Sequence, residues 1–181
     1  MRFHPLSLLA FFFIPFFGSS CVGEPEFAKE PAIKFESIVH KSFNSLDSVI
    51  ITVSFQDGDG NLGLDNSDSE PDFGAENTDG TPNPFFNNFY IRMMKKEGET
   101  YSKIELPDGV EFDARFPRVG EGSESPVEGN LTRRLRLDIG VFDSPFISGD
   151  TLKFEIQIAD RAKNVSNIVE TPDIILKGFE E

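Results

Sequence analysis

The chain of 181 residues contains no tryptophan, one cysteine and two histidines. With Cys21 as its only cysteine, it cannot form an intramolecular disulfide. Outside the first 20 residues His40 is the only histidine, so the sequence excludes an ordinary zinc site built from cysteine and histidine. A Ser-His-Asp triad would depend entirely on His40, which we expect at the surface beside Lys41. No phosphate-binding or dinucleotide-binding motif is present either, and we therefore expect no enzyme.

Positive charge is also scarce. The 17 lysines and arginines are outnumbered by 31 aspartates and glutamates, for a net charge of −14. Such a surface repels nucleic acid and anionic lipid headgroups, so we expect no nucleic-acid partner. Between Ser42 and Ile91 there is no lysine, arginine or histidine. An external cation is therefore a natural counter-ion for the acids of that stretch.

The N-terminus has the pattern of a secretion signal. Arg2 precedes an apolar run from Leu6 to Phe17, and Gly18-Ser19-Ser20 leads to Cys21. The run is too short to span a bilayer, which needs roughly 20 residues, and fits a cleaved signal. The end of the run resembles a bacterial lipobox, although Gly18 stands where leucine is usual. The resemblance implies that residues 1–20 are removed and that Cys21 anchors the protein to the outer membrane, facing the periplasm or the outside.

After a flexible tether over residues 21–31, apolar and polar residues alternate in short segments, and no window has the spacing typical of a helix. The alternation predicts strands at 33–39, 49–55, 89–94, 101–106, 110–116, 135–141, 152–158 and 168–176. Strands with one apolar face each must bury those faces against one another. We therefore expect an all-β fold over residues 32–181, an immunoglobulin-like antiparallel β-sandwich (fibronectin or bacterial type) of seven to eight strands. A small β-barrel is the alternative.

Two long loops interrupt the predicted strands, one at 57–85 and one at 117–130. The first begins with DGDGNLGLDNSD, which places oxygen-bearing side chains at the alternating positions used by cation-binding loops. The residues predicted to bind the ion are Asp57, Asp59, Asn61, Gly63 (through its carbonyl), Asp65 and Asp68. The many protein oxygens favour calcium over magnesium. The alternative is a solvated turn whose side chains never converge.

A second polar stretch, ADRAKNVSN at 159–167, precedes the last predicted strand. In an immunoglobulin-like order, this loop lies at the same end of the sandwich as the loop that begins at Asp57. We therefore expect Asp160 and Asn164 to complete or brace the ion site, unless they only shape a turn. The lipobox, the DGDG loop and this turn together resemble uncharacterised Bacteroidota-type lipoproteins. The resemblance implies an outer-membrane immunoglobulin-like lipoprotein with no known activity.

Two further clusters bear on partners. Arg133, Arg134 and Arg136 form the only basic cluster and are expected to pair with carboxylates such as Glu155, although they could also bind an anionic ligand. Phe85 and Phe86, at the end of the acidic loop, either form a contact patch or pack under the loop.

The sequence as a whole predicts a lipid-anchored binding or scaffold module of the cell envelope, with a structural calcium loop. Its protein or glycan partner is unknown. The alternative is an accessory glycan-binding lipoprotein of an outer-membrane uptake system, which the absence of tryptophan disfavours.

Overall fold

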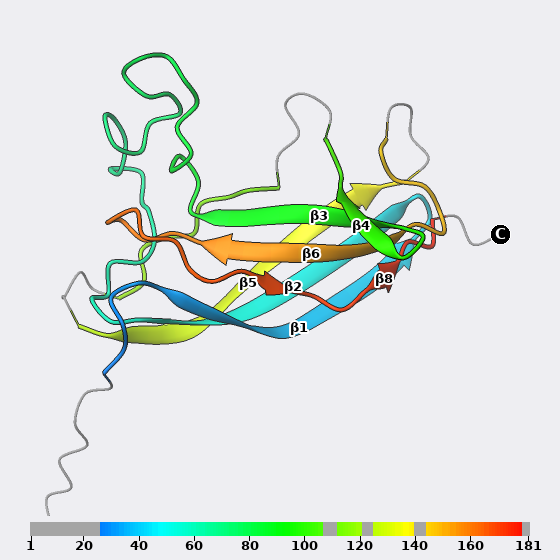
Figure 1. The fold of residues 1–181 in the computed structure, drawn as a ribbon, viewed down its shortest axis with the longest axis horizontal. Coiled ribbons are helices and arrows are strands. Elements are labelled where there is room, and N and C mark those ends of the chain that lie inside the picture. The colour runs from blue at the N-terminus through cyan, green and yellow to red at the C-terminus, as the bar shows by residue number, and fades with distance from the viewer. Residues whose placement is uncertain (1–25, 107–111, 121–124, 140–143, 179–181) are drawn as a thin grey trace, which may run out of the picture.

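The structure is a computed structural model, and it describes residues 26–106, 112–120, 125–139 and 144–178 (Figure 1). Its strands are β1 (Ala32–Phe43), β2 (Leu46–Asp57), β3 (Phe89–Glu97), β4 (Thr100–Lys103), β5 (Val127–Asp138), β6 (Thr151–Ile158), β7 (Val169–Glu170) and β8 (Ile174–Ile175). Within these ranges there is no helix, and hence none that is long and apolar enough to cross a membrane. The predicted signal peptide at 1–20 and the predicted lipidation site Cys21 lie outside the described residues.

The eight strands form two antiparallel sheets. One sheet has the order β1-β2-β5, and the other has the order β4-β3-β6-β7 with β8 also paired to β6. The chain changes sheet between β2 and β3 and again on either side of β5, as in immunoglobulin domains. The expected immunoglobulin-like β-sandwich is therefore confirmed. The described strands do not close into the barrel that was the alternative.

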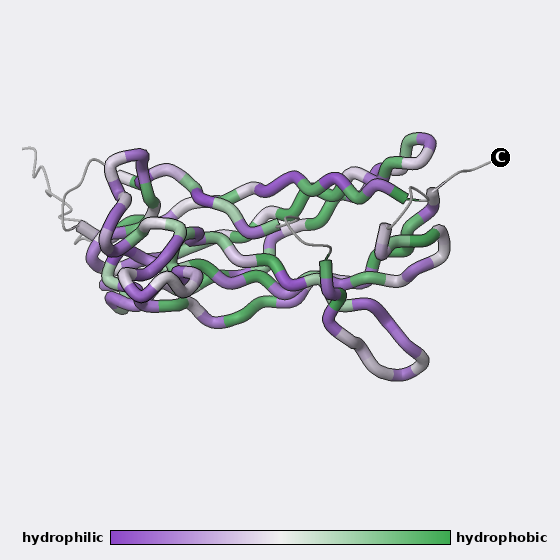
Figure 2. Tube along the Cα trace, turned by 90° about the horizontal axis from the view of Figure 1, so that it is seen from above, coloured by the Kyte–Doolittle hydropathy of each residue, from purple (hydrophilic) through white to green (hydrophobic). Residues whose placement is uncertain are grey.

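The core lies between the inward columns of the two sheets. Val49, Ile51 and Val53 of β2 are fully buried, and so is every second residue of β6 from Leu152 to Ile158. Because successive side chains of a strand point to opposite faces, an apolar residue at every second position fills one face only. Figure 2 shows this alternation of hydrophobic and hydrophilic residues along the strands. Each such burial stabilises the fold by roughly 1.5–3 kcal/mol.

The predicted strand at 135–141 begins earlier than its pattern indicates. Residues 127–130, predicted as part of a loop, pair with the end of β2. Gly129 lies there on the inward column, where a Cβ atom would be 3.1 Å from the ring of Phe55. The ring of Phe55, on the neighbouring strand β2, occupies the space that a side chain at position 129 would need. The apolar alternation of β5 is therefore interrupted at Gly129.

The predicted strand at 110–116 is wrong for the residues from 112 on. Ala114 makes an isolated bridge with Phe89, and no strand forms around it. The N–H of Ile91 donates to the Asp113 carboxylate at 2.8 Å. A side chain thus takes the position that a backbone carbonyl would hold in a continuous ladder.

Asn167 joins the two sheets along one side. Its side-chain oxygen accepts the N–H of Ile33 and its side-chain nitrogen donates to the Ile33 carbonyl, both at 2.9 Å. These bonds satisfy backbone groups of β1, an edge strand that would otherwise leave them unpaired. The link lies close to the end of the sandwich at which β2 and β6 end.

Candidate metal centre

Asp57 and Asp160 continue the inward columns of the two sheets. Asp57 is the last residue of β2, two positions after Phe55, and Asp160 lies two positions after Ile158, the end of β6. Alternation turns both side chains inward, so that Asp57 is 0% exposed and Asp160 is 3% exposed. Since β2 and β6 belong to facing sheets, the two carboxylates meet at one end of the core.

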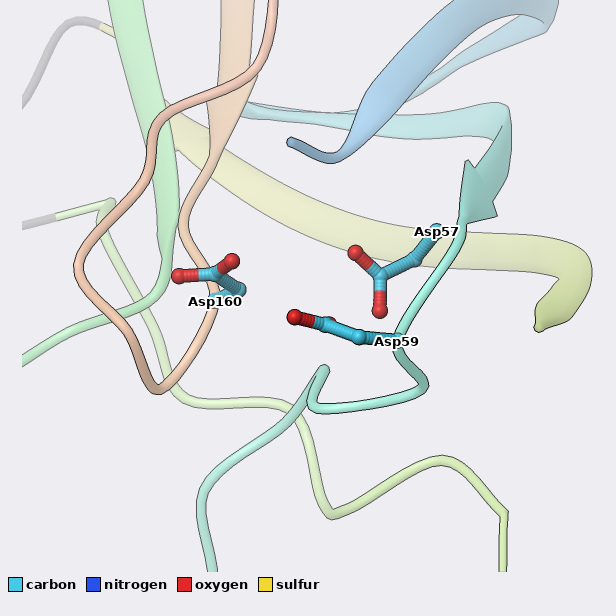
Figure 3. A group of neighbouring side chains, drawn as sticks. All are labelled: Asp57, Asp59 and Asp160. Atoms are coloured by element: carbon cyan, nitrogen blue, oxygen red, sulfur yellow. The ribbon is translucent and has the colours of Figure 1, made fainter. Parts of the chain in front are cut away.

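Asp59 completes a cluster of three carboxylates. One oxygen each from Asp57, Asp59 and Asp160 lies within 4.8 Å of the other two. Figure 3 shows the side chains converging from the end of β2 and from the loop after β6. Calcium binds oxygen atoms at 2.3–2.6 Å, so oxygens on opposite sides of the ion are about 5 Å apart. One calcium ion can therefore contact all three carboxylates.

Three side-chain oxygens near this point are buried and have no hydrogen-bond partner among the described residues. They are Oδ1 of Asp57, Oδ1 of Asp59 and Oδ1 of Asn61. The N–H of Asn61 donates to Oδ2 of Asp57 at 3.0 Å, which places Asn61 beside the cluster. An unpaired buried polar group costs about 1–3 kcal/mol. Oxygen atoms without hydrogen-bond partners, on alternate residues of one turn, are typical ligands of a hard cation such as calcium.

Charge is also unbalanced in the cluster. Burial and the negative charges of Asp59 and Asp160 raise the pKa of Asp57 from 3.8 to about 6, although the N–H groups of Asn61 and Gly60 act to lower it. Two carboxylates at the 4.8 Å limit repel each other by roughly 3.5 kcal/mol at an effective dielectric constant of 20. A divalent cation would offset the repulsion between the carboxylates and would coordinate the oxygens that lack hydrogen-bond partners.

The loop after β6 braces the cluster from the other side. Asn164 donates its N–H to Oδ1 of Asp160 at 2.7 Å and its side-chain N–H to Oδ2 at 2.8 Å. Leu62 forms an isolated bridge with Asp160, and the N–H of Arg161 donates to the Asn61 carbonyl at 3.2 Å. Asn164 therefore orients a carboxylate of the cluster, and the two predicted loops are joined.

Gly58 brings the N-terminal segment to the same place. Its N–H donates to the Ala28 carbonyl at 2.7 Å, and a Cβ atom at position 58 would be 2.3 Å from the Phe27 carbonyl oxygen. Pro31 is buried as well. Residues 26–31, expected to be part of a free tether, thus lie against the turn between Asp57 and Asp59.

The structure does not bring Asp65 and Asp68 to the cluster. Asp68 accepts two hydrogen bonds from Arg118, at 2.5 Å from Nη2 and 3.0 Å from Nε. The hydrogen bond from Arg118 lowers the pKa of Asp68. Asp65 accepts the N–H of Ser67 at 2.7 Å and lies 3.2 Å from Arg118, and the bonds from Ser67 lower its pKa. Arginine thus neutralises the acids that we had assigned to an ion.

Sequence reasoning missed two arginines that hold the acidic loop by its carbonyl groups. Arg161 donates to the carbonyls of Leu62 and Gly63, both at 3.1 Å. Gly63, predicted to offer its carbonyl to the ion, offers it to Arg161. Arg115 donates to the Asp68 carbonyl at 2.9 Å, across 47 residues of sequence. The only available signal was that Arg161 directly follows Asp160.

The two phenylalanines at the end of the acidic loop have different surroundings. The guanidinium of Arg115 lies 4.6 Å from the ring centroid of Phe86, which is 38% exposed. Phe85 is partly buried and lines a hollow of about 310 Å³. The other lining residues are Pro84, Tyr90, Arg92, Asp113, Gln157 and Val165.

His40 is not a free surface residue, which corrects our expectation. Its side chain is 16% exposed, and its Nε2 lies 2.8 Å from Oδ2 of the fully buried Asp47. Ser42 Oγ lies 3.4 Å from the same ring nitrogen. A Ser-His-Asp triad places serine and aspartate on opposite nitrogens of the ring, so these three residues lack triad geometry.

No protein-family model matches this chain, and neither does any curated protein or solved structure. The interpretation of the cluster rests on its geometry.

Proposed function

We propose that this protein is a lipid-anchored, non-enzymatic binding or scaffold module of the cell envelope with a structural calcium site. Asp57, Asp59 and Asp160 would hold the ion, and the amide oxygen of Asn61 would add a fourth ligand. The observation that supports the proposal is the convergence of three carboxylates at the end of the core, where Asp57, Asp59 and Asn61 each keep a buried oxygen without a hydrogen-bond partner. The bound ion would supply positive charge and join the end of β2 to the loop after β6.

Such a site would make the end of the sandwich sensitive to calcium in the surroundings. Calcium sites of extracellular modules have dissociation constants of roughly 10⁻⁴–10⁻³ M. A ligand that binds only the folded state stabilises it by about 2.7 kcal/mol at 100 times its dissociation constant. Calcium would therefore order the turn that begins at Asp57 and the segment docked on it through Gly58.

Thermal unfolding with calcium and with chelator tests the metal. Calcium should raise the Tm of the natural protein, and Asp59→Asn should abolish that rise, because the variant lacks one carboxylate of the cluster. The matched control is Asp65→Asn, which alters an acid of the same loop that lies outside the cluster and should keep the calcium response. Equal Tm values of the natural protein in calcium and in chelator would contradict the calcium proposal.

The anchor is proposed from Cys21 alone and is tested separately. Cells grown with labelled palmitate should incorporate the label into this protein, and Cys21→Ser should abolish incorporation and release the protein from the membrane fraction. The relationship to Bacteroidota-type lipoproteins stays a prediction from the lipobox, the DGDG loop and the late turn.

A second candidate function, glycan binding, is favoured by the hollow beside Phe85. Its volume of about 310 Å³ is at the lower end of the range for small-molecule sites. The two aromatic rings of Phe85 and Tyr90 and several polar side chains at its wall suit the apolar and hydroxyl surfaces of a sugar. A glycan-array screen tests this function, with binding expected to be lost in Phe85→Ala and retained in Phe86→Ala.

A further inference from the structure

The lysines and arginines of the two sheets differ in their surroundings. All five on β3, β4 and β6 form ion pairs with carboxylates, namely Arg92, Lys95, Lys96, Lys103 and Lys153. None of the five on β1 and β5 pairs with a carboxylate among the described residues. Glu155, the expected partner of the arginine cluster, pairs with Arg92 at 3.8 Å. In so acidic a chain, unpaired cations gathered on one sheet need a separate explanation.

Four of these cations share the outward face of the sheet. Lys34, Lys41, Arg134 and Arg136 are all exposed, while Arg133 alternates to the inward side. We call this surface the β1–β2–β5 outer face. Two acids of β5 flank the cations on this face: Asp138 is in the row next to Lys41 and Arg136, and Glu128 is in the row next to Lys34. Glu36 lies at the β1 bulge, and no acid lies in the rows between Lys34 and Lys41 on β2 or β5.

In the register of the sheet, Lys41, Arg134 and Arg136 lie next to small and apolar side chains. One row across the sheet reads Lys41, Ser48 and Arg136. The next row reads Val39, Ile50 and Arg134. Strands lie about 4.8 Å apart and residues two positions apart on a strand about 6.8 Å, so the charges surround an area about 10 Å wide.

Apolar side chains are exposed on the same face. Val39 is 43% exposed and Phe43 is 76% exposed, the latter at the turn between β1 and β2. Cations interspersed with exposed aliphatic and aromatic groups suit the boundary between lipid headgroups and acyl chains. An acidic peptide would pair with the cations, but it would not account for the exposed aromatic ring of Phe43 on the same face.

The N-terminal segment enters the sheet that carries this face, at the end of β1 opposite Lys41 and Phe43. Residues 26–31 are docked on Gly58 and lead directly into β1 (Figure 1). Only five peptide bonds separate Cys21 from Glu26, a reach of at most about 18 Å. Beyond the turn that follows β2, the acidic loop rises past β3 in Figure 1, away from β1, so most of the loop is not drawn over the outer face. Charges more than about 8–10 Å away are largely screened at physiological salt.

The net charge predicts repulsion between the protein as a whole and anionic lipid headgroups, but the unpaired cations are gathered on one face. We propose that the β1–β2–β5 outer face lies on the anionic lipid headgroups of the membrane that holds the N-terminus. This proposal rests on the proposed lipid anchor at Cys21. An anchored chain keeps the face at a high effective concentration near the headgroups, so a weak contact suffices to orient the domain. Each cation near an anionic surface adds about fivefold to the preference for it. The domain would lie flat on its first sheet and expose β3, β4 and β6.

The single cysteine permits a direct test. The mature chain, from residue 21 on, contains every residue of the described core and can be coupled through Cys21 to a maleimide lipid in preformed vesicles. Lysine acetylation rates are then measured by mass spectrometry on neutral phosphatidylcholine vesicles and on vesicles with one-third phosphatidylglycerol. Acetylation of Lys41 should slow about fivefold on the anionic vesicles, and acetylation of Lys103 on the other sheet should not change. Added 0.5 M NaCl should restore the Lys41 rate.

Charge reversal provides the matched variants. Arg134→Glu with Arg136→Glu should restore the Lys41 rate on anionic vesicles, whereas Arg92→Glu on the opposite sheet should leave the protection intact. A Tm measurement for each variant checks that it folds. The proposal is overturned if Lys41 reacts equally fast on both kinds of vesicle, if neutral vesicles protect it as well, or if the double variant stays protected. Because the coupling is chemical, this outcome is independent of whether cells lipidate Cys21, which the palmitate experiment decides.

Discussion

The raised pKa of Asp57 predicts that the metal-free protein loses stability as pH rises through the range from about 4 to 6. The folded state holds the proton more tightly than the unfolded state, whose carboxyl has its ordinary pKa of 3.8, against about 6 in the folded protein. Each pKa unit is worth 1.36 kcal/mol, so the whole window corresponds to about 3 kcal/mol. At pH 5 the unfolded group is already ionised, and about 1.4 kcal/mol of this stability remains to be lost on going to pH 7.5.

Thermal unfolding in chelator at the two pH values measures this loss. For a domain of this size, 1 kcal/mol shifts Tm by about 2–4 °C, so the contribution of Asp57 lowers Tm by about 3–6 °C between pH 5 and pH 7.5. Asp57→Asn should remove this contribution, because the replacement carries no charge in either state. Asp65→Asn, at a partly exposed acid of the same loop that lies outside the cluster, should retain it.

Calcium should reverse the trend, since the ion competes with the proton for the same carboxylate. The rise in Tm on adding calcium should be large at pH 7.5 and small at pH 5. Two results would refute the reasoning: a pH dependence in chelator that Asp57→Asn leaves unchanged, or a calcium effect that is equal at both pH values.

Three further predictions concern the frame around the site. Asn167→Ala removes both side-chain hydrogen bonds to Ile33 and should lower the free energy of unfolding in urea by about 1–3 kcal/mol. The amide hydrogen of Ile33 should also exchange faster, and an unchanged exchange rate would contradict the link described between the sheets. Leu62→Ala leaves a cavity at a position that is 0% exposed and should lower the free energy of unfolding in urea by about 2–5 kcal/mol. A stability equal to that of the natural protein would show that Leu62 is not packed as described. Arg118→Gln removes the partner of Asp68 and should leave the calcium-induced rise in Tm intact, whereas loss of that rise would place Asp68 among the ligands.

Local alternation was sufficient to predict most of the fold. β2 and β6 bury every second residue, so their sequences alone indicate strands and their inward faces. β5 was placed too late in the sequence because Gly129 leaves room for the ring of Phe55 on the neighbouring strand. The predicted strand at 110–116 failed because Asp113 bonds to the edge of β3 through its side chain. Both errors arise from contacts between segments that are distant in sequence.

The candidate site was predicted in part. The alternating oxygens of residues 57, 59 and 61 and the position of Asp160 after the penultimate predicted strand pointed to one end of the sandwich, where the three carboxylates converge. Asp65 and Asp68 have the spacing of ligands and are held by Arg118. Spacing constrains how neighbouring side chains can turn, but it carries no information about a cation contributed by another loop.

Sequence by itself determined the all-strand fold, the inward direction of Asp57 and the overall acidity of the chain. The period of a strand and the sum of charges are properties of the residues in order, and neither depends on what lies opposite. Only the tertiary structure decided which acids remain without a positive neighbour and on which surface the unpaired cations collect. Pairing depends on distances of a few ångströms between groups up to about a hundred positions apart, and folding alone sets those distances.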